Sequence, residues 1–476
     1  MKATRIKPFS LLALGLVLIA ASHMTFNIEI LAWVSSVPFL LYLDKTRGFW
    51  SRLYFALTLI IAWSLCVFKI ATDPLPLVMI PLFSVPIALI QLPAYLLWSK
   101  YRNRKYSFLL FPATMVLMEW VQYTLTPLGS WGAAAYTQVD HIILMQSDSI
   151  FGIGGLSFLI YFVNSTLFEV INFGKGAVKK LISISILLCI VLVFGSLRLD
   201  IYKSAGRDQI KVAAVGTDSE VGGLPLPSDE TRWANQAALK ERTKKAASLE
   251  AKIVVWNEAA TAVLPEEEEE WKRQLSSLAK QNKITLVAAY VVPLSESPFR
   301  FENKYLMYLP DGSLSYSYNK HEPVPGEPSI KGKEVIKTIP VDGIKIGGAI
   351  CYDYDFPYLA KAFGKADADI VALPSSDWRG IDPIHTKMAA VRAIEQGHSV
   401  LRSTRFGLSA AINPIGELVS QQSSWDHNDK IMLSHLPDKG VVTLYSLIGD
   451  LFVYLCMLFI VLFLAIKKTP REVREV

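Results

Sequence analysis

Three polar residues in the second half of the chain each follow a short apolar run and are of types that support covalent catalysis. Glu258 follows residues 253–257, Lys320 follows 316–319 and Cys351 follows 346–350, and each run has the pattern of a strand. Folds that mix helices and strands commonly gather their sites at strand ends. Taken singly, the three could be a surface carboxylate, a surface amine and a buried thiol. Taken together, they combine a base, a cation and a nucleophile.

The chemistry that fits this combination is acyl transfer through a thioester. A thiolate is a strong nucleophile, but the thiol needs a base to take its proton. Glu258 could serve as that base, and Lys320 with the backbone N–H after Cys351 could stabilise an oxyanion. Cys351 is also distinguished by its position in the chain. The other cysteines lie inside long apolar runs, offer no disulfide framework and are expected to be packing groups: Cys66, Cys189 and Cys456.

The region that carries these residues has the pattern of a layered α/β domain. From about residue 208, short β-branched runs alternate with amphipathic helices, and Asp311-Gly312 and Asp342-Gly343 are hairpin signals. No internal repeat is evident. We expect strands at 209–214, 252–257, 284–292, 303–309, 344–350, 369–373 and 399–403, and helices at about 228–250, 266–281, 354–364 and 383–397.

No metal site or cofactor is expected. The acidic run from Glu266 to Glu270 follows Pro265 and opens a helix, where negative side chains complement the positive end of the helix dipole. No Cys/His cluster or paired carboxylate at ligand spacing occurs elsewhere.

The composition predicts a membrane protein. The 476 residues are 52% hydrophobic and only 19% charged, which is too apolar for an ordinary soluble domain. The net charge of +6 does not indicate nucleic-acid binding, because the basic residues sit in short runs beside apolar segments. Eight apolar stretches are each about long enough to span a bilayer as a helix: 8–25, 27–44, 52–71, 75–98, 107–126, 150–172, 181–197 and 445–466. The first also resembles a signal peptide, but we keep it as a span.

Loop charges predict the orientation of these spans. The loops near 22–26, 72–76 and 127–149 carry no Lys or Arg, whereas the alternate loops are basic, so the positive-inside rule places both termini in the cytoplasm and residues 198–444 outside. The basic positions on the inner side are Lys2, Arg5, Lys7, Lys45, Arg47, Arg52, Lys100, Arg102, Arg104, Lys105, Lys175, Lys179, Lys180, Lys467, Lys468, Arg471 and Arg474.

Two ionisable residues fall within the predicted spans, where charge is costly. We interpret Lys69 as a side chain that reaches the outer interface and Glu119 as a hydrogen-bonded residue inside the helical bundle. The glycine-rich, aromatic loop from Gly129 to Gln138 could alternatively form part of a lipid-facing vestibule.

The chain resembles the nitrilase, or carbon-nitrogen hydrolase, superfamily. Its members use Glu, Lys and Cys in this order, and the match is carried by Val-Val-Trp-Asn-Glu, Tyr-Asn-Lys-His and Ala-Ile-Cys-Tyr-Asp. With spans before and after the domain, it looks like the apolipoprotein N-acyltransferases, the membrane-anchored branch of this superfamily. The resemblance implies a helical membrane bundle and an extramembrane α-β-β-α sandwich, divided as 1–200 (seven spans), 201–444 (catalytic domain) and 445–476 (last span and basic tail).

The resemblance also implies a reaction and a location. Cys351 would accept an acyl chain from a membrane phospholipid and pass it to the α-amine of the diacylglyceryl-cysteine of an apolipoprotein, at the outer side of a bacterial inner membrane. Glu327 matches a further family glutamate that orients Lys320. Aromatic residues in nearby loops could line an apolar cleft for the lipid chains, although each could equally be ordinary packing: Trp233, Phe299, Phe301, Phe356 and Tyr358.

Several positions depart from the family pattern around these motifs. Asn257 precedes the base where the family usually has Pro, Asp353 stands two residues after the nucleophile in place of Glu, and Ser376 replaces an Asn. The segment after Lys320 is one residue shorter than the pattern. None of these departures removes Glu258, Lys320 or Cys351.

Three alternative functions remain open at this point. The same residues would serve a membrane-anchored amidase or nitrilase that hydrolyses its acyl-enzyme, although a hydrolase of soluble amides has no need of eight spans. A non-catalytic lipoprotein-binding relative would have no reason to keep the three residues together. A transporter is disfavoured because the spans contain few charges.

Overall fold

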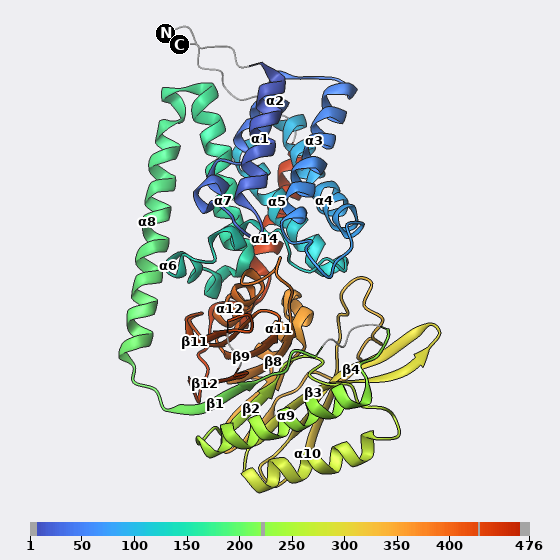
Figure 1. Ribbon diagram of the computed structural model, residues 1–476. Coiled ribbons are helices and arrows are strands. Elements are labelled where there is room, and N and C mark those ends of the chain that lie inside the picture. Colours follow the sequence, from blue (N-terminus) through green and yellow to red (C-terminus); the bar gives the residue numbers. More distant parts are fainter. Residues whose placement is uncertain (1–6, 220–223, 427–428, 467–476) are drawn as a thin grey trace. The chain divides into compact units, whose positions relative to one another are not determined.

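The computed structural model describes residues 7–219, 224–426 and 429–466 and divides into two compact units. The first unit comprises residues 1–200 with 448–476, and the second comprises 201–447. Figure 1 shows the first as helices and the second as strands with flanking helices. The basic residues expected at the N-terminus (Lys2, Arg5) and in the tail (467–474) lie outside the described residues.

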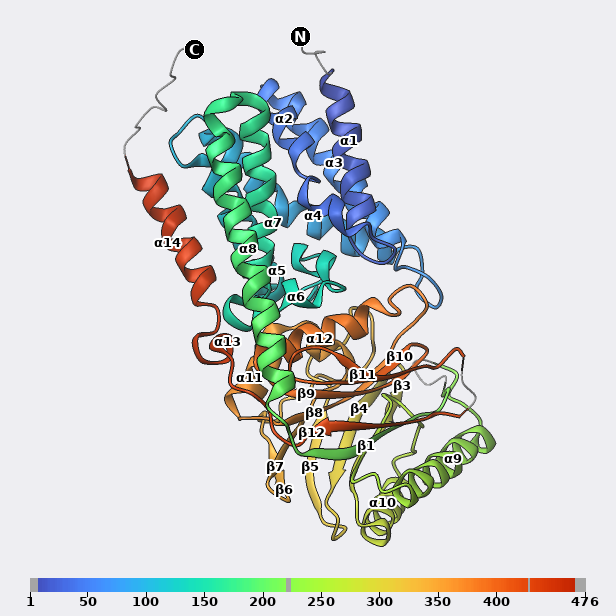
Figure 2. The same cartoon turned by 90° about the vertical axis from the view of Figure 1, so that its left-hand side faces the viewer.

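The first unit is helical. Its α5 helix contacts α4, α7 and α14, and Figure 2 shows these helices from the side. The elements are α1 Pro8–Ser22, η1 Glu29–Trp33, α2 Val37–Lys45, α3 Phe49–Phe68, α4 Met79–Tyr101, α5 Ser107–Leu125, η2 Ala134–Gln138, α6 Ile142–Met145, α7 Asp148–Phe173, α8 Lys175–Ser204 and α14 Leu451–Ala465.

Five of the helices that the structure describes are long and apolar enough to cross a membrane: α3, α4, α5, α7 and α8, the last counted from Lys179. They correspond to the third to seventh expected spans. The helices at the first and last expected spans, α1 and α14, are apolar but have 15 residues each. At 1.5 Å per residue each is about 22 Å long, shorter than a hydrocarbon core of about 30 Å. Of the eight expected spans, five therefore have helices of spanning length.

The second expected span is not a single helix, which corrects the prediction for 27–44. The chain there forms the short helices η1 and α2, and α2 has only nine residues. Pro38 lies in the first turn of α2, where proline favours a new helix start. Asn164 of α7 stabilises the break, because its side chain accepts from the Ser36 N–H at 2.8 Å and donates to the Ala32 carbonyl at 2.9 Å.

The two ionisable residues of the predicted spans have hydrogen-bond partners within the bundle. Lys69 donates to the carbonyls of Ala20 and His23 at the end of α1. Glu119 is buried, and its Oε1 accepts from the Ala134 N–H and the Tyr161 hydroxyl, both at 2.9 Å. Glu119 is therefore a hydrogen-bonded residue of the bundle, as predicted, and it anchors the glycine-rich loop.

The second unit contains two six-stranded sheets, ordered β12-β1-β2-β3-β4-β5 and β11-β10-β9-β8-β7-β6. The strands are β1 Gln209–Val215, β2 Ile253–Trp256, β3 Thr285–Glu296, β4 Phe299–Tyr308, β5 Leu314–Asn319, β6 Ile339–Val341, β7 Ile344–Gly348, β8 Ile370–Ser376, β9 Ser399–Arg405, β10 Leu408–Ile412, β11 Leu418–Ser423 and β12 Ile431–Pro437. The helices are α9 Asp229–Ser248, α10 Glu268–Asn282, η3 Cys351–Asp355, α11 Pro357–Lys365, α12 Ile384–Gln396 and α13 Leu444–Ile448.

Three apolar layers hold these elements together as the expected α-β-β-α sandwich. Residues from both sheets, including Val255, Tyr305, Ile346 and Leu401, form the central layer. A second layer packs α9 and α10 against the first sheet, and a third packs α11 and α12 against the other. Within each sheet the central strands are parallel, β1-β2-β3 and β7-β8-β9. Their carboxyl ends therefore lie at one edge of each sheet.

Candidate active site

The three residues singled out by the sequence lie where strands of the two sheets end. Glu258 lies two residues after the end of β2, and Lys320 directly follows β5 in the same sheet. Cys351 follows β7 of the other sheet and begins η3. All three are buried, with exposed fractions of 4%, 2% and 4%, so they lie in the sandwich interior rather than on its surface.

Lys320 binds two carboxylates. Its Nζ donates to Glu258 Oε1 at 2.8 Å and to Glu327 Oε2 at 2.7 Å. Its backbone N–H donates to the Asn303 carbonyl at 2.8 Å, which places the side chain beside β4. The structure therefore places Glu327 where the resemblance expected it, in direct contact with Lys320.

Asn303 also binds both carboxylates, those of Glu258 and Glu327. The sequence does not predict this contact. Its Nδ2 donates to Glu258 Oε1 at 2.7 Å and to Glu327 Oε1 at 3.0 Å. Glu327 also accepts from the Ser329 hydroxyl at 2.8 Å and from the Val324 N–H at 3.0 Å. Because each of these contacts is a donor to a carboxylate oxygen, together they fix the positions of the two glutamate side chains.

Cys351 is held in an unusual backbone conformation. Its φ angle is 48°, in the left-handed region that residues other than glycine rarely adopt. Such a turn between a strand and a helix holds the side chain at the end of the strand in a strained conformation of the kind found at other nucleophile positions. The thiol donates to the Ser376 carbonyl at the end of β8, 3.3 Å away.

The charges around the thiol act in opposite directions on its pKa. Burial raises the pKa of Cys351 well above its usual value, Glu258 raises it further, and Lys320 opposes both. Burial would lower the pKa of the Lys320 ammonium, but Glu258 and Glu327 outweigh burial and raise that pKa. Lys320 is therefore charged, and the resting Cys351 is a protonated thiol that needs a base before it can attack.

Comparisons with known proteins assign the chain to a family. A model of the apolipoprotein N-acyltransferase N-terminal domain matches residues 15–166, and a model of the carbon-nitrogen hydrolase domain matches 211–436. An apolipoprotein N-acyltransferase of Rickettsia bellii is 25% identical over 76% of this chain and 76% of its own length. Apolipoprotein N-acyltransferase 1 of Treponema denticola is also 25% identical, over 96% of each chain. The chain belongs to the apolipoprotein N-acyltransferase family.

Solved structures align with about half of the chain. An amidase from Nesterenkonia sp. covers 48% of this chain and 91% of its own, at 18% identity and a TM-score of 0.39. Nit3 of Saccharomyces cerevisiae, of the nitrilase superfamily, covers 48% and 90%, at 25% identity and a TM-score of 0.40. In this chain the hydrolase-type domain is joined to helices that are long and apolar enough to cross a membrane, and with its apolipoprotein N-acyltransferase relatives this makes it a membrane protein.

The residues that depart from the family pattern of apolipoprotein N-acyltransferases make contacts within the site. Asn257 Nδ2 donates to the Glu258 carbonyl at 2.9 Å, and its Oδ1 accepts from the Thr217 N–H at 2.8 Å. Ser376, whose carbonyl accepts from the thiol, also accepts from Arg405 Nε through its hydroxyl at 2.8 Å. Asn257 and Ser376 therefore both form hydrogen bonds to the segments that position Glu258 and Cys351.

Asp353 supports the turn that carries the thiol. Its Oδ2 accepts from the Ile350 N–H at 2.9 Å and the Tyr318 hydroxyl at 2.8 Å, and its Oδ1 accepts from the Glu322 N–H at 2.7 Å. Burial raises the pKa of this carboxyl from 3.8 to about 6, with the hydrogen bonds opposing it. The shorter acid that replaces the family Glu therefore still ties the Cys351 turn to the segment after Lys320.

The predicted lipid-contacting aromatic residues occupy different surroundings. Phe301 is buried with Ala259, beside Glu258, and Phe299 packs against it with ring centroids 5.6 Å apart. Trp233 is 56% exposed on α9. Tyr358 is 44% exposed on α11 and donates to Glu322 Oε1 at 2.5 Å, while Phe356 is buried. The structure thus brings Phe299 and Phe301 together, and separately Phe356 and Tyr358, whose ring centroids are 6.1 Å apart. A role in lipid binding stays a prediction for all five.

One group of side chains has the composition of a metal site. Atoms of Cys351, Asp377 and His385 lie within 4.8 Å of one another, and all three residues are buried. However, both ring nitrogens of His385 face carboxylates, and the guanidinium of Arg402 lies 2.8 Å from Asp377. A divalent cation would have to displace these contacts and lie beside an arginine, so this donor set does not suit a metal.

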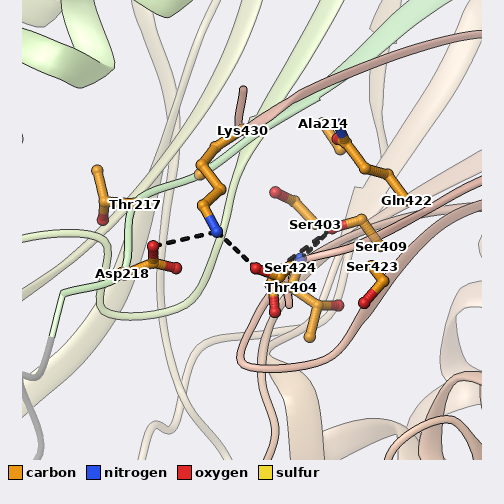
Figure 3. Close-up of a pocket in the computed structure, with 11 residues that line it drawn as sticks. Ala214, Thr217, Asp218, Ser403, Thr404, Ser409, Gln422, Ser423, Ser424 and Lys430 are labelled. Atoms are coloured by element: carbon orange, nitrogen blue, oxygen red, sulfur yellow. Dashed lines mark hydrogen bonds and ion pairs between the residues drawn. The ribbon is translucent and has the colours of Figure 1, made fainter. Parts of the chain in front are cut away.

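A small polar pocket lies apart from the candidate site. Figure 3 shows it lined by Ser, Thr and Gln side chains from β9, β10 and β11, together with Ala214 of β1 and Thr217 just after it. Lys430 crosses it, with Nζ 3.0 Å from Asp218 Oδ2 and 2.6 Å from the Ser424 carbonyl. Glu258, Lys320 and Cys351 are not among its lining residues, and its one cation is already paired. We therefore assign no role in catalysis to it.

Proposed function

We propose that the protein transfers a fatty acyl group from a membrane phospholipid to the α-amine of the diacylglyceryl-cysteine of an apolipoprotein, through a thioester on Cys351. The protein is an acyltransferase of the carbon-nitrogen hydrolase superfamily, and its relatives are named for lipoprotein N-acylation. The observation that carries the proposal is the contact of Lys320 with Glu258 at 2.8 Å, at strand ends next to the Cys351 turn.

In the first half-reaction the enzyme becomes acylated. Glu258 takes the thiol proton as Cys351 Sγ attacks the ester carbonyl carbon, forming a C–S bond and an oxyanion. An ammonium has three N–H donors, and the two carboxylates accept two of those of Lys320. The third can donate to the oxyanion together with the Tyr352 N–H. The ester C–O bond then breaks, Glu258 returns the proton to the leaving alkoxide, and the lysophospholipid departs.

In the second half-reaction the acyl group passes to the amine. The neutral α-amine attacks the thioester carbonyl carbon, and Glu258 takes a proton from the amine nitrogen as the C–N bond forms. The oxyanion is stabilised by the same donors. The C–S bond breaks, the thiolate takes the proton from Glu258, and the amide product leaves. The site returns to its starting protonation state, so no further reactant is needed.

The experiment that tests this function follows both products by mass. The purified full-length protein is placed in vesicles whose phospholipid carries one isotopically labelled acyl chain, together with a diacylglyceryl-cysteine peptide. We expect the peptide to gain one labelled chain on its α-amine, while a matched peptide with an acetylated α-amine stays unchanged. Release of free fatty acid or of ammonia from small amides, without peptide acylation, would establish the hydrolase alternative instead. No consumption of phospholipid at all would support a binding protein.

A further inference from the structure

A second group of buried ionisable residues lies near Cys351, on elements other than those that carry Lys320 and Glu258. These residues have no part in the two half-reactions. Asp355 ends η3, Asp377 follows β8, His385 lies in the first turn of α12 and Arg402 is in β9. Their exposed fractions are 2%, 4%, 4% and 1%. Charged groups are costly to bury unless they are paired, so four of them beside a nucleophile call for a role.

The contacts of His385 favour its protonated form. Its Nδ1 lies 2.7 Å from Asp377 Oδ1 and its Nε2 lies 3.1 Å from Asp355 Oδ1. The guanidinium NH2 of Arg402, which can only donate, also lies 3.0 Å from Nδ1. Asp355 and Asp377 are therefore the acceptors toward which the two N–H donors of an imidazolium would point. Burial would lower the pKa of His385, but Asp355 and Asp377 outweigh burial and raise it to about 9.

Arg402 completes the network. Its two terminal nitrogens bind the two oxygens of Asp377, NH2 to Oδ1 at 2.8 Å and NH1 to Oδ2 at 3.0 Å. NH1 also donates to the hydroxyls of Thr386 and Thr404, both at 2.7 Å. Two carboxylates and two cations therefore balance to a net charge of zero.

The network reaches the thiol by two routes. Asp377 directly follows Ser376, whose carbonyl accepts from Cys351 Sγ, so anchoring Asp377 fixes the acceptor of the thiol. The network also acts on the thiol through space, because Asp377 raises the pKa of Cys351 and Arg402 lowers it, after the larger effects of burial, Glu258 and Lys320.

Several charged and titratable groups surround these residues. Asp382, half-buried before α12, interacts with Asp377 and Arg402. The groups that face His385 are Asp355, Asp377 and Arg402. The groups that face the thiol are Glu258, Lys320, Asp377, Arg402, Arg405 and Tyr352.

We propose that Asp355, His385, Asp377 and Arg402 form a charge-neutral positioning network that holds the Cys351 thiol against Ser376 and controls its nucleophilicity through the network's own net charge. The inference rests on the proposed function only in taking Cys351 as the nucleophile. Loss of the imidazolium would leave two carboxylates and one guanidinium, a net charge of −1 beside the thiol. A negative neighbour disfavours the thiolate, so the thiol would react more slowly.

The test uses the alkylation rate of Cys351, which needs neither substrate. The full-length protein in detergent is treated with iodoacetamide from pH 6 to 10, and the peptide that contains Cys351 is quantified by mass. The variants are His385→Gln, Asp355→Asn and the double variant His385→Gln/Asp355→Asn. Glu395→Gln is the matched control, because it removes a buried carboxylate of the same helix whose partner is Arg392, at 2.8 Å.

If the net charge of the network controls the thiol, the double variant should recover the alkylation rate. A role in packing alone predicts no such recovery. At pH 7.5 we expect His385→Gln to react about tenfold more slowly, as for a displacement of the thiol equilibrium by one pH unit. Asp355→Asn leaves the network neutral or positive, so it reacts at least as fast as wild type. The double variant restores neutrality and returns to within about twofold of wild type. Glu395→Gln reacts as wild type does.

Two results would overturn the proposal. In the first, Cys351 is alkylated more slowly in the double variant than in His385→Gln, as expected if each substitution only removes packing. In the second, Cys351 of His385→Gln is alkylated at the wild-type rate. In both results Cys351 of the wild-type protein is still alkylated, so neither contradicts the proposed function. Failure of that function is a distinct outcome, in which the wild-type protein transfers no labelled chain to the peptide, whatever the alkylation rate of Cys351.

Discussion

At the scale of single residues, one amide holds both carboxylates of the site. Asn303 donates to Glu258 and Glu327 from the same Nδ2, so it sets the separation of the base from the carboxylate that supports Lys320. Without it, Glu258 would keep the contact to Lys320 but lose a donor that fixes its orientation. Small displacements of a base are costly because proton transfer needs hydrogen-bond geometry.

Replacing Asn303 by Ala should therefore lower kcat about 10- to 100-fold and leave KM for the peptide within about threefold, since the change affects the base rather than binding. Asn303→Asp should lose more, because it adds a third negative charge beside two carboxylates. Steady-state kinetics with labelled phospholipid measure both. Asn282→Ala, which removes an amide at the end of α10, is the control and should retain wild-type rates. An equal loss in the control, or a change in KM alone, would contradict the assigned role.

The sequence predicts the three candidate catalytic residues better than their supports. Glu258, Lys320 and Cys351 each follow an apolar run, and their order matches a known pattern. Asn303 has no such signal. It lies within β4, where a polar residue usually indicates an outward-facing position, and only the pairing of β4 between β3 and β5 turns it toward Lys320. The partners of His385 are separated from it by up to 30 residues, so its charge could not be predicted from the sequence.

At the scale of elements, the first turn of α12 is tied to the end of β8 and to β9 by a histidine that keeps its proton to a higher pH in the folded state than in the unfolded state. The pKa of His385 is raised from 6.5 to about 9, because Asp355 and Asp377 outweigh the effect of burial. A raised pKa means that the folded state binds a proton that the unfolded state releases. The stabilisation is complete below pH 6.5 and is lost as the pH rises through about 9.

Thermal unfolding of the full chain should therefore show a falling midpoint between pH 6.5 and 9. The difference in pKa corresponds to about 3 kcal/mol of unfolding free energy across this window. His385→Gln should flatten the dependence while lowering the midpoint at pH 6. Tryptophan fluorescence during heating in detergent measures the midpoint. If the variant keeps the wild-type slope, another group is responsible for the loss of stability.

Elements with strong local patterns were predictable, and elements that depend on their neighbours were not. The four helices α9 to α12 and the central parallel strands lie close to their expected positions, and the hairpin at Asp342-Gly343 joins β6 to β7 with positive φ at both residues. β10, β11 and β12 were not predicted. β11 reads Leu-Val-Ser-Gln-Gln-Ser, which lacks an apolar face, and it is a strand because it pairs with β10 at the sheet edge.

At the scale of the whole molecule, the chain joins a helical unit to an α/β unit, and the orientation of the second across the membrane stays a prediction. Apolar length in the sequence did not reveal the break within 27–44. Pro38 marks the start of α2, but the contacts that stabilise the break come from Asn164, more than 100 residues away. The division into 1–200, 201–444 and 445–476 as functional domains likewise remains a proposal.

Compartment reporters fused within residues 201–444 and after the C-terminus should report opposite sides of the inner membrane. The physical reason is the asymmetry of basic loops, which retains Lys/Arg-rich segments in the cytoplasm. A reporter that is active only outside the cytoplasm and one that is active only inside should give complementary results at the two sites. Finding both sites on one side would refute the predicted topology.

Trapping of the acyl-enzyme tests the central claim most directly. The full-length protein is incubated with labelled phospholipid and no acceptor, and its peptides are analysed by mass. We predict one labelled acyl chain on the peptide that contains Cys351, released by hydroxylamine, and the same result in a Cys66→Ala/Cys189→Ala/Cys456→Ala variant. Cys351→Ala should carry no chain and show no acyl transfer. Peptide acylation that persists in Cys351→Ala would contradict the covalent mechanism.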